Sequence, residues 1–124
     1  MIVVIGCVLG LLAYCEHTEN PISYFATYSE AKSSGIMDRG WIPTYIPQSS
    51  TEIRETHNID TNRVQMTFKY SVGDTKELEK NCTTQKISEN LFQYKCTYFE
   101  SDVIVELRTN GSAKLVSQPK EKKN

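Results

Sequence analysis

The sequence predicts an α+β domain in which an N-terminal helix packs on an antiparallel sheet of about four strands, held by one disulfide. Three observations favour this fold. Apolar residues recur at helical spacing just after residue 20, apolar and polar residues alternate strictly in the second half, and turn-forming residues separate the alternating segments. Because the predicted strands follow one another through short turns, we expect antiparallel pairing.

The predicted helix spans residues 21–34. Asn20 suits the N-cap, and Pro21 suits the first helical position, where no amide donor is needed. Gly35 is expected to end the helix in the left-handed conformation, with Ile36 making the apolar contact that accompanies this cap. The residues expected to share one face, at spacings of three and four, are Ile22, Phe25, Ala26 and Ser29.

Residues 38–47 contain two prolines and are not expected to form regular structure. Pro43 and Pro47 each favour an extended conformation at the residue before them. Because the segment also contains Trp41 and other apolar side chains, we expect it to run extended across the core and to cover one edge.

A short second helix is predicted from Ser49 to about His57. Ser49 and Glu52 have the spacing of a capping box, which satisfies backbone amides at the start of a helix. Asn58 can end this helix, and residues 60–62 form a cluster that favours a turn.

The alternating segments predict the strands. In the clearest of them, residues 64–72, every second side chain is apolar, and Gly73 ends the strand. Asp74 and Glu77 have capping-box spacing, which predicts a short helical segment leading into Cys82. The later strands are predicted over residues 92–98, 103–108 and 113–117, with the last two joined by the hairpin signal Asn110-Gly111.

Cys82 and Cys96 are the cysteines expected in the folded domain. Cys7 lies within an apolar leader, and Cys15 directly follows that leader. In an oxidising compartment the remaining pair is expected to form a disulfide that closes a loop of about 15 residues. The spacing of the pair does not match a redox motif or a zinc site, so we expect neither role.

The first fifteen residues predict export and anchoring. Residues 2–13 carry no charge and fit the apolar core of a secretory signal, but they are fewer than the roughly 20 that span a bilayer as a helix. The abrupt change to polar sequence at Cys15 resembles a bacterial lipoprotein signal, in which this cysteine is lipidated. Leu12 and Ala13 fit that signal, whereas Tyr14 stands where a small residue is expected.

This interpretation places the protein in the bacterial cell envelope, membrane-anchored and exposed to the periplasm or the cell surface. The alternatives are an uncleaved N-terminal anchor, ordinary signal cleavage, or a buried element of a cytosolic domain. The predicted parts are a lipoprotein-type signal (1–14), a short tether (15–20), a single α+β domain (21–118) and a charged, flexible tail (119–124).

Composition and motifs argue against several classes of function. The net charge is −1 and no basic stripe is present, so a nucleic-acid partner is not expected. The sequence lacks the GxSxG nucleophile motif, the HExxH metal motif and a glycine-rich phosphate loop. We therefore expect no catalytic residue, no cofactor, no metal and no identifiable small-molecule ligand.

The densest polar cluster lies within residues 52–63. Glu55 and His57 could support acid–base chemistry, but two residues apart on the predicted helix they point in different directions. We therefore expect a structural joint in which Arg54 binds a carboxylate such as Asp60. The alternative is a contact surface for a partner, whose candidate residues are Trp41, Tyr45, Arg54, Glu55, His57 and Asp60.

Three stretches of the sequence resemble the YbbD head domain family of small bacterial envelope proteins. They are Gly40-Trp41-Ile42-Pro43, Ile46-Pro47, and the run from Thr51 to Asn62 followed by Phe68. The resemblance covers residues 24–117. It implies a lipid-anchored envelope protein, and it assigns neither an activity nor a catalytic residue.

Three functions follow as hypotheses. The first, which we prefer, is a non-enzymatic binding or structural module, anchored to the membrane by lipid, that contacts another envelope protein. The second is a periplasmic inhibitor or immunity-type protein, which would need a protruding loop, and residues 73–90 are the candidate. The third is a small hydrolase or metal enzyme centred on Glu55, His57 and Asp60.

Overall fold

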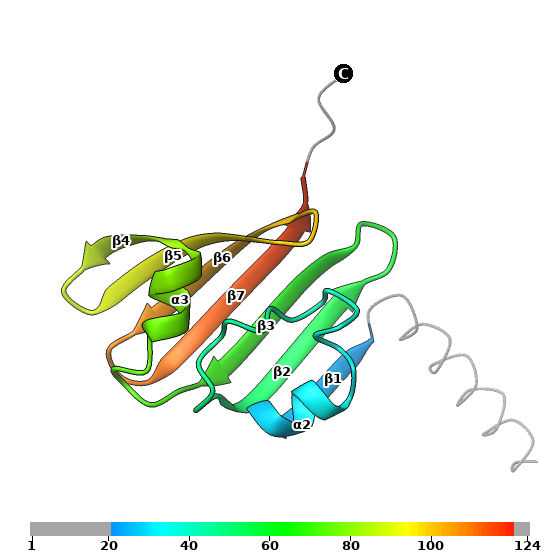
Figure 1. The fold of residues 1–124 in the computed structure, drawn as a ribbon, viewed down its shortest axis with the longest axis horizontal. Coiled ribbons are helices and arrows are strands. Elements are labelled where there is room, and N and C mark those ends of the chain that lie inside the picture. The colour runs from blue at the N-terminus through cyan, green and yellow to red at the C-terminus, as the bar shows by residue number, and fades with distance from the viewer. Residues whose placement is uncertain (1–20, 121–124) are drawn as a thin grey trace, which may run out of the picture.

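The computed structural model describes residues 21–120, which form a mostly-β domain of one seven-stranded antiparallel sheet and two short helices (Figure 1). The predicted α+β fold with a sheet of about four strands is therefore wrong. The elements are β1 (Ile22–Thr27), α2 (Tyr28–Ser33), β2 (Thr51–Asn58), β3 (Arg63–Lys69), α3 (Lys76–Asn81), β4 (Thr83–Ser88), β5 (Leu91–Tyr98), β6 (Ser101–Arg108) and β7 (Ser112–Pro119).

The strands lie in the order β1-β2-β3-β7-β6-β5-β4. Every pair is antiparallel, and β3 and β7 are the neighbours in the sheet that do not follow one another along the chain. Met66 of β3 lies opposite Leu115 of β7, and both side chains are buried. The last strand therefore joins the early and late parts of the chain in the middle of the sheet.

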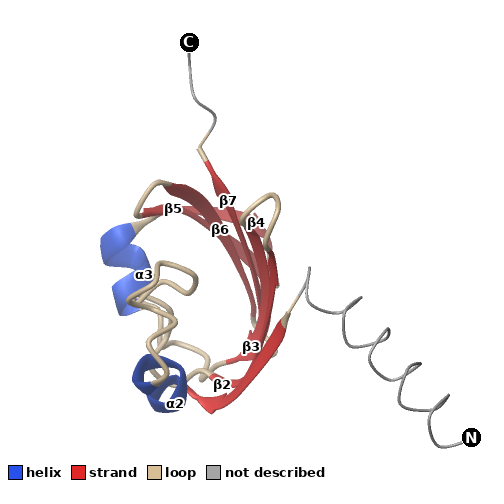
Figure 2. Cartoon of the chain, turned by 90° about the vertical axis from the view of Figure 1, so that its right-hand side faces the viewer, coloured by secondary structure: helices blue, strands red, loops and turns tan. Residues whose placement is uncertain are grey.

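The hydrophobic core lies on one face of the sheet. Figure 2 shows the sheet curving around α2, α3 and the segment that connects α2 to β2. That segment, residues 34–50, is buried against the sheet through Ile36, Ile42 and Ile46. We call this side of the sheet the inner face. No described element covers the opposite side, which we call the outer face.

The predicted helix over residues 21–34 is largely wrong, because its first half is the edge strand β1. The side chains of Ile22 and Tyr24 in this strand are exposed, whereas the side chain of Phe25 is partly buried and packs against the core. The helix begins only at Tyr28, where the Thr27 hydroxyl accepts a hydrogen bond from the Glu30 amide.

The helix predicted from Ser49 to about His57 is also wrong, because residues 51–58 form β2. Ser49 does not act as a helix cap. Its hydroxyl accepts a hydrogen bond from the Ser71 amide, and its own amide donates to the Asp74 carboxylate. These bonds tie the end of the covering segment to the loop that follows β3.

Gly35 follows α2 with a φ of 84°, and the Gly35 amide donates to the carbonyl of Lys32, so the predicted helix end is confirmed. The later strands and the β6–β7 hairpin at Asn110-Gly111 are confirmed as well. The predicted helical turns before Cys82 correspond to α3. Strand β4 was not predicted, because every residue in it is exposed and it has no alternating pattern.

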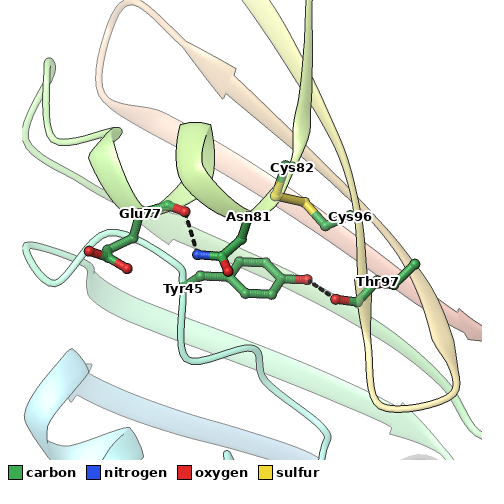
Figure 3. The surroundings of a disulfide bond; sticks show 6 residues. All are labelled: Tyr45, Glu77, Asn81, Cys82, Cys96 and Thr97. Atoms are coloured by element: carbon green, nitrogen blue, oxygen red, sulfur yellow. Dashed lines mark hydrogen bonds between the residues drawn. A yellow bond between two sulfur atoms is a disulfide. The ribbon is translucent and has the colours of Figure 1, made fainter.

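The predicted disulfide between Cys82 and Cys96 is confirmed (Figure 3). It connects the end of α3 to β5, with the two Cα atoms 4.5 Å apart. Nearby, the Tyr45 hydroxyl donates a hydrogen bond to the carbonyl of Thr97 at 3.1 Å. The disulfide and this bond both fasten an element of the inner face to β5.

The predictions about the signal, the tether, lipidation of Cys15 and the last residues of the tail lie outside residues 21–120. Within those residues, neither helix is long and apolar enough to cross a membrane.

Candidate functional site

A cleft of about 800 Å³ opens at the end of the sheet where β7 finishes. Its floor contains Val64 of β3 and Ser117 of β7, which are paired in the sheet. Residues 39–41 form one wall, and residues 99–101, from the turn after β5 and the start of β6, form the other. Lys120 lines the cleft at the end of β7. We call this feature the Trp41 cleft.

A series of stacked side chains leads from the cleft into the core. The Arg39 guanidinium lies over the Trp41 ring, 5.0 Å from its centre. The Trp41 ring in turn contacts the His57 ring, with the two ring centres 3.9 Å apart. His57 Nδ1 lies 3.8 Å from Oε1 of Glu55. An exposed cation is thus connected through two rings to a carboxylate that is 0% exposed.

The strand conformation of β2 explains why Glu55 and His57 lie together. Side chains two positions apart on a strand point to the same face, so both residues join Ile53 on the inner face. The expectation that Glu55 and His57 point apart was wrong because it assumed a helix. On the strand they form the one pair of ionisable side chains within the core of the described residues.

The buried pair is poorly satisfied. Both carboxylate oxygens of Glu55 and the Nδ1 atom of His57 make no hydrogen bond of normal geometry within the described residues. Burial raises the pKa of Glu55 to about 7, although the nearby Ser23 hydroxyl and the Arg39 guanidinium both act to lower it. This carboxyl can therefore hold or release a proton near neutral pH.

The pair nevertheless lies behind Trp41 and does not line the cleft. His57 is 3% exposed, and the residues of the cleft floor are Val64 and Ser117 instead. Residues 21–120 contain no group of three His, Cys, Asp or Glu side chains that could hold a metal ion. The arrangement can bind a ligand against Trp41, while Glu55 and His57 support that ring from behind.

The two walls of the cleft meet at Gly40 and Phe99. Gly40 has a φ of 82°, and a Cβ atom placed on it would lie 2.7 Å from Cδ2 of Phe99. Phe99 itself has a φ of 53°, and its ring is 68% exposed. A side chain at position 40 would therefore push the Phe99 ring out of its position beside the cleft.

We expect Gly40→Ala to lower the free energy of unfolding by about 1–3 kcal/mol. Both the left-handed backbone and the contact with Phe99 contribute to this loss. Gly35→Ala is the matched control, because Gly35 has a similar φ of 84° but no atom within 4 Å of the added Cβ. Chemical denaturation should show a larger loss for Gly40→Ala, and Phe99→Ala in the same chain should remove the difference. Equal losses in the two glycine variants would contradict the contact.

The structure brings together only some of the candidate residues. Trp41, Glu55 and His57 form the stacked series, whereas Tyr45 is buried in the core with its ring edge-on to Tyr98. Arg54 lies on the outer face, and Asp60 is exposed in the turn after β2. The predicted ion pair between Arg54 and Asp60 does not form within the described residues.

Sequence reasoning missed the side of the cleft contributed by Phe99, Ser117 and Lys120. Phe99 could have been noticed because it is a large apolar residue next to the turn-forming Glu100. A turn position is not expected to be buried, so an apolar side chain there indicates a candidate contact surface. The approach of this turn to Gly40 depends on the order of the strands, which the sequence did not reveal.

Residues 19–69 match the YbbD head domain family model. The resemblance noted in the sequence is thus confirmed over these residues, which end with β3. The match includes Trp41, Glu55 and His57, but it stops before Phe99 and the disulfide. No curated protein and no solved structure matches the chain.

Proposed function

We propose that this chain is a non-enzymatic, lipid-anchored protein of the bacterial envelope that binds an acidic segment of another envelope protein in the Trp41 cleft. The observation that carries the proposal is the combination of Arg39 and two aromatic walls at one opening. The proposal for the anchor rests on the apolar leader and the cysteine that follows it. The disulfide gives modest support for an oxidising compartment.

The chemistry of the cleft favours an acidic segment that also carries an apolar side chain. Arg39 makes no ion pair among the described residues and faces solvent, so it can pair with an incoming carboxylate. Lys120 adds a second cation, and Glu100 is the carboxylate that lines the same opening. The exposed ring of Phe99 and the half-buried ring of Trp41 would hold the apolar part.

The other two hypotheses receive less support. The inhibitor hypothesis needed a protruding loop over residues 73–90, but much of that stretch forms α3 and β4. The enzyme hypothesis needed Asp60 beside Glu55 and His57, yet Asp60 lies in the exposed turn beyond β2. We therefore propose that Glu55 and His57 have a supporting role behind Trp41.

The test is crosslinking in envelopes of the native host. A photo-crosslinking residue at position 99 should yield a discrete adduct, and the same residue at position 87 should not, because Ile87 is exposed on β4 away from the cleft. We expect Arg39→Glu to reduce the adduct about tenfold, since a repulsive charge replaces an attractive one. Lys86→Glu on β4 is the control with the same change in charge. Equal adducts from positions 99 and 87, or no effect of Arg39→Glu, would contradict binding in the cleft.

A direct measurement uses the fluorescence of Trp41, which is the single tryptophan of the chain. The crosslinked segment, made as a peptide, should change the Trp41 emission on binding. A peptide with amides in place of its carboxylates should bind about tenfold more weakly. Equal affinity for the two peptides would show that the cations of the cleft do not select the ligand.

A further inference from the structure

The outer face of the sheet is the part of the molecule that the proposed function does not use. Side chains on it alternate with those of the core, and no described element covers them. It faces away from the Trp41 cleft, whose floor residues Val64 and Ser117 belong to the inner face.

This face carries an excess of positive charge. Residues 21–120 contain 12 basic and 12 acidic residues, so the described domain as a whole is balanced. The strands nevertheless place six basic residues but only three acidic ones on the outer face, which leaves the rest of the domain acidic. The basic residues are Arg54, Arg63, Lys69, Lys95, Arg108 and Lys114, and the acidic ones are Glu52, Asp102 and Glu106.

The charges are concentrated around a shallow hollow of about 500 Å³ over β2, β3, β7 and β6. Arg54 and Lys114 lie one strand to either side of Thr67, as the strand register places them. Lys69 is paired with Glu52 at 2.9 Å, whereas Arg54 makes no ion pair among the described residues. Four basic and two acidic side chains line the hollow, so it carries a net positive charge that attracts anionic groups.

Exposed apolar side chains lie next to this hollow on the edge strand. Ile22 is 66% exposed and Tyr24 is 61% exposed, and Tyr24 lines the hollow beside its strand partner Arg54. Tyrosine and aliphatic side chains next to cations are the composition that favours the headgroup region of a bilayer.

The length of chain before β1 limits where this face can lie. Five residues, 16–20, separate the proposed lipidated cysteine from the described domain, and a fully extended chain from Cys15 to Pro21 would reach about 20 Å. This step rests on the anchor of the proposed function. An anchor at Cys15 would hold Ile22 and Tyr24 close to the bilayer surface.

We propose that the outer face docks on the anionic headgroups of the membrane, with β1 and the basic hollow in contact and the Trp41 cleft directed away from the bilayer. Arg54, Lys69 and Lys114 neutralise lipid phosphates, while Tyr24 enters the headgroup layer. Docking would fix the orientation of the cleft and present it to partners from the aqueous side.

The experiment is lysine footprinting of the full chain, purified from host membranes and reconstituted in vesicles. The vesicles contain phosphatidylcholine alone or phosphatidylcholine with phosphatidylglycerol, and a short acetylation pulse is read by mass spectrometry. With phosphatidylglycerol we expect acetylation of Lys69 and Lys114 to slow about fivefold. Lys76 and Lys80 on α3, which lies on the inner side, should react at unchanged rates.

Charge-reversal variants make the test specific. Arg54→Glu combined with Arg108→Glu should abolish the protection of Lys69 and Lys114. Lys76→Glu combined with Lys80→Glu, the control on α3, should preserve it. Uniform protection of all lysines, or equal rates on both kinds of vesicle, would overturn the proposal. So would equal protection by inorganic phosphate or by polyglutamate on neutral vesicles, because the face would then bind small anions or an acidic protein.

Flotation of the same vesicles separates this inference from the proposed anchor. A chain that floats with neutral vesicles but shows no lipid-dependent footprint has an anchor and does not dock. A chain that floats only with phosphatidylglycerol, with the expected footprint, docks without an anchor. A chain that floats with neither kind contradicts both proposals.

Discussion

The free energy of unfolding should fall by about 3 kcal/mol as the pH rises from below 4.5 to above 7, and Glu55→Gln should remove this fall. The cause is the burial of Glu55, which raises its pKa from an ordinary 4.5 to about 7. The folded protein therefore holds the proton of this carboxyl more tightly than the unfolded chain does.

The direction of the effect follows from that difference in proton binding. Below pH 4.5 both states carry the proton, and Glu55 imposes no charge on the core. Between pH 4.5 and about 7 the unfolded chain releases the proton first, so unfolding becomes progressively easier. Above pH 7 the folded protein contains a buried carboxylate, and the full loss of stability is reached.

Chemical denaturation across this pH range measures the effect as the difference between wild type and variant. Ionisable groups that do not contact Glu55 contribute equally to both chains and cancel. Asp102→Asn, which changes an exposed carboxylate on β6, should leave the pH dependence as it is in wild type. Parallel curves for wild type and Glu55→Gln would show that Glu55 does not titrate abnormally in the folded state.

The same residue shows why β2 could not be predicted from the sequence. Its inward positions are Ile53, Glu55 and His57, so two of the three are polar. A strand is recognised by the alternation of apolar and polar side chains. In this strand the alternation fails, because Glu55 and His57 are polar although they face the core. The capping-box spacing of Ser49 and Glu52 then favoured a helix, although tertiary hydrogen bonds use Ser49 differently.

Edge position explains the other two strands that were missed. Strand β1 buries only part of one face, and its apolar residues also fit helical spacing. Strand β4 is exposed throughout and is held by pairing with β5 and by the neighbouring disulfide. By contrast, β3 has three buried apolar residues, Val64, Met66 and Phe68, at alternate positions, and its pattern identified it directly.

The sequence identified three residues of the candidate site but not how they are arranged. Trp41, Glu55 and His57 attracted attention because of their chemistry, but the contact between Trp41 and His57 depends on how the covering segment folds over β2. The position of Phe99 depends on the order of strands across the whole sheet. Pairings between distant segments are set by the buried surface as a whole, which no local pattern contains.

Removing the disulfide should have a second large effect on stability. Cys82 and Cys96 are separated by 14 positions, and opening a loop of this size costs about 3 kcal/mol in the chain-entropy description of the unfolded state. The loss should be uneven along the chain. The bond fastens the end of α3 to β5 beside the exposed edge strand β4, whereas β3 and β7 lie in the centre of the sheet.

We therefore expect Cys82→Ala combined with Cys96→Ala to lower the free energy of unfolding by about 3 kcal/mol. Hydrogen exchange should accelerate first in α3 and β4, while β3 and β7 exchange only with global unfolding. A reductant should destabilise wild type by a similar amount and leave the double variant unchanged, because the variant has no bond to reduce. If the variant and the oxidised wild type unfolded at the same denaturant concentration, the buried side chain of Leu78 and the pairing of β4 with β5 would be enough to hold α3 and β4 in place.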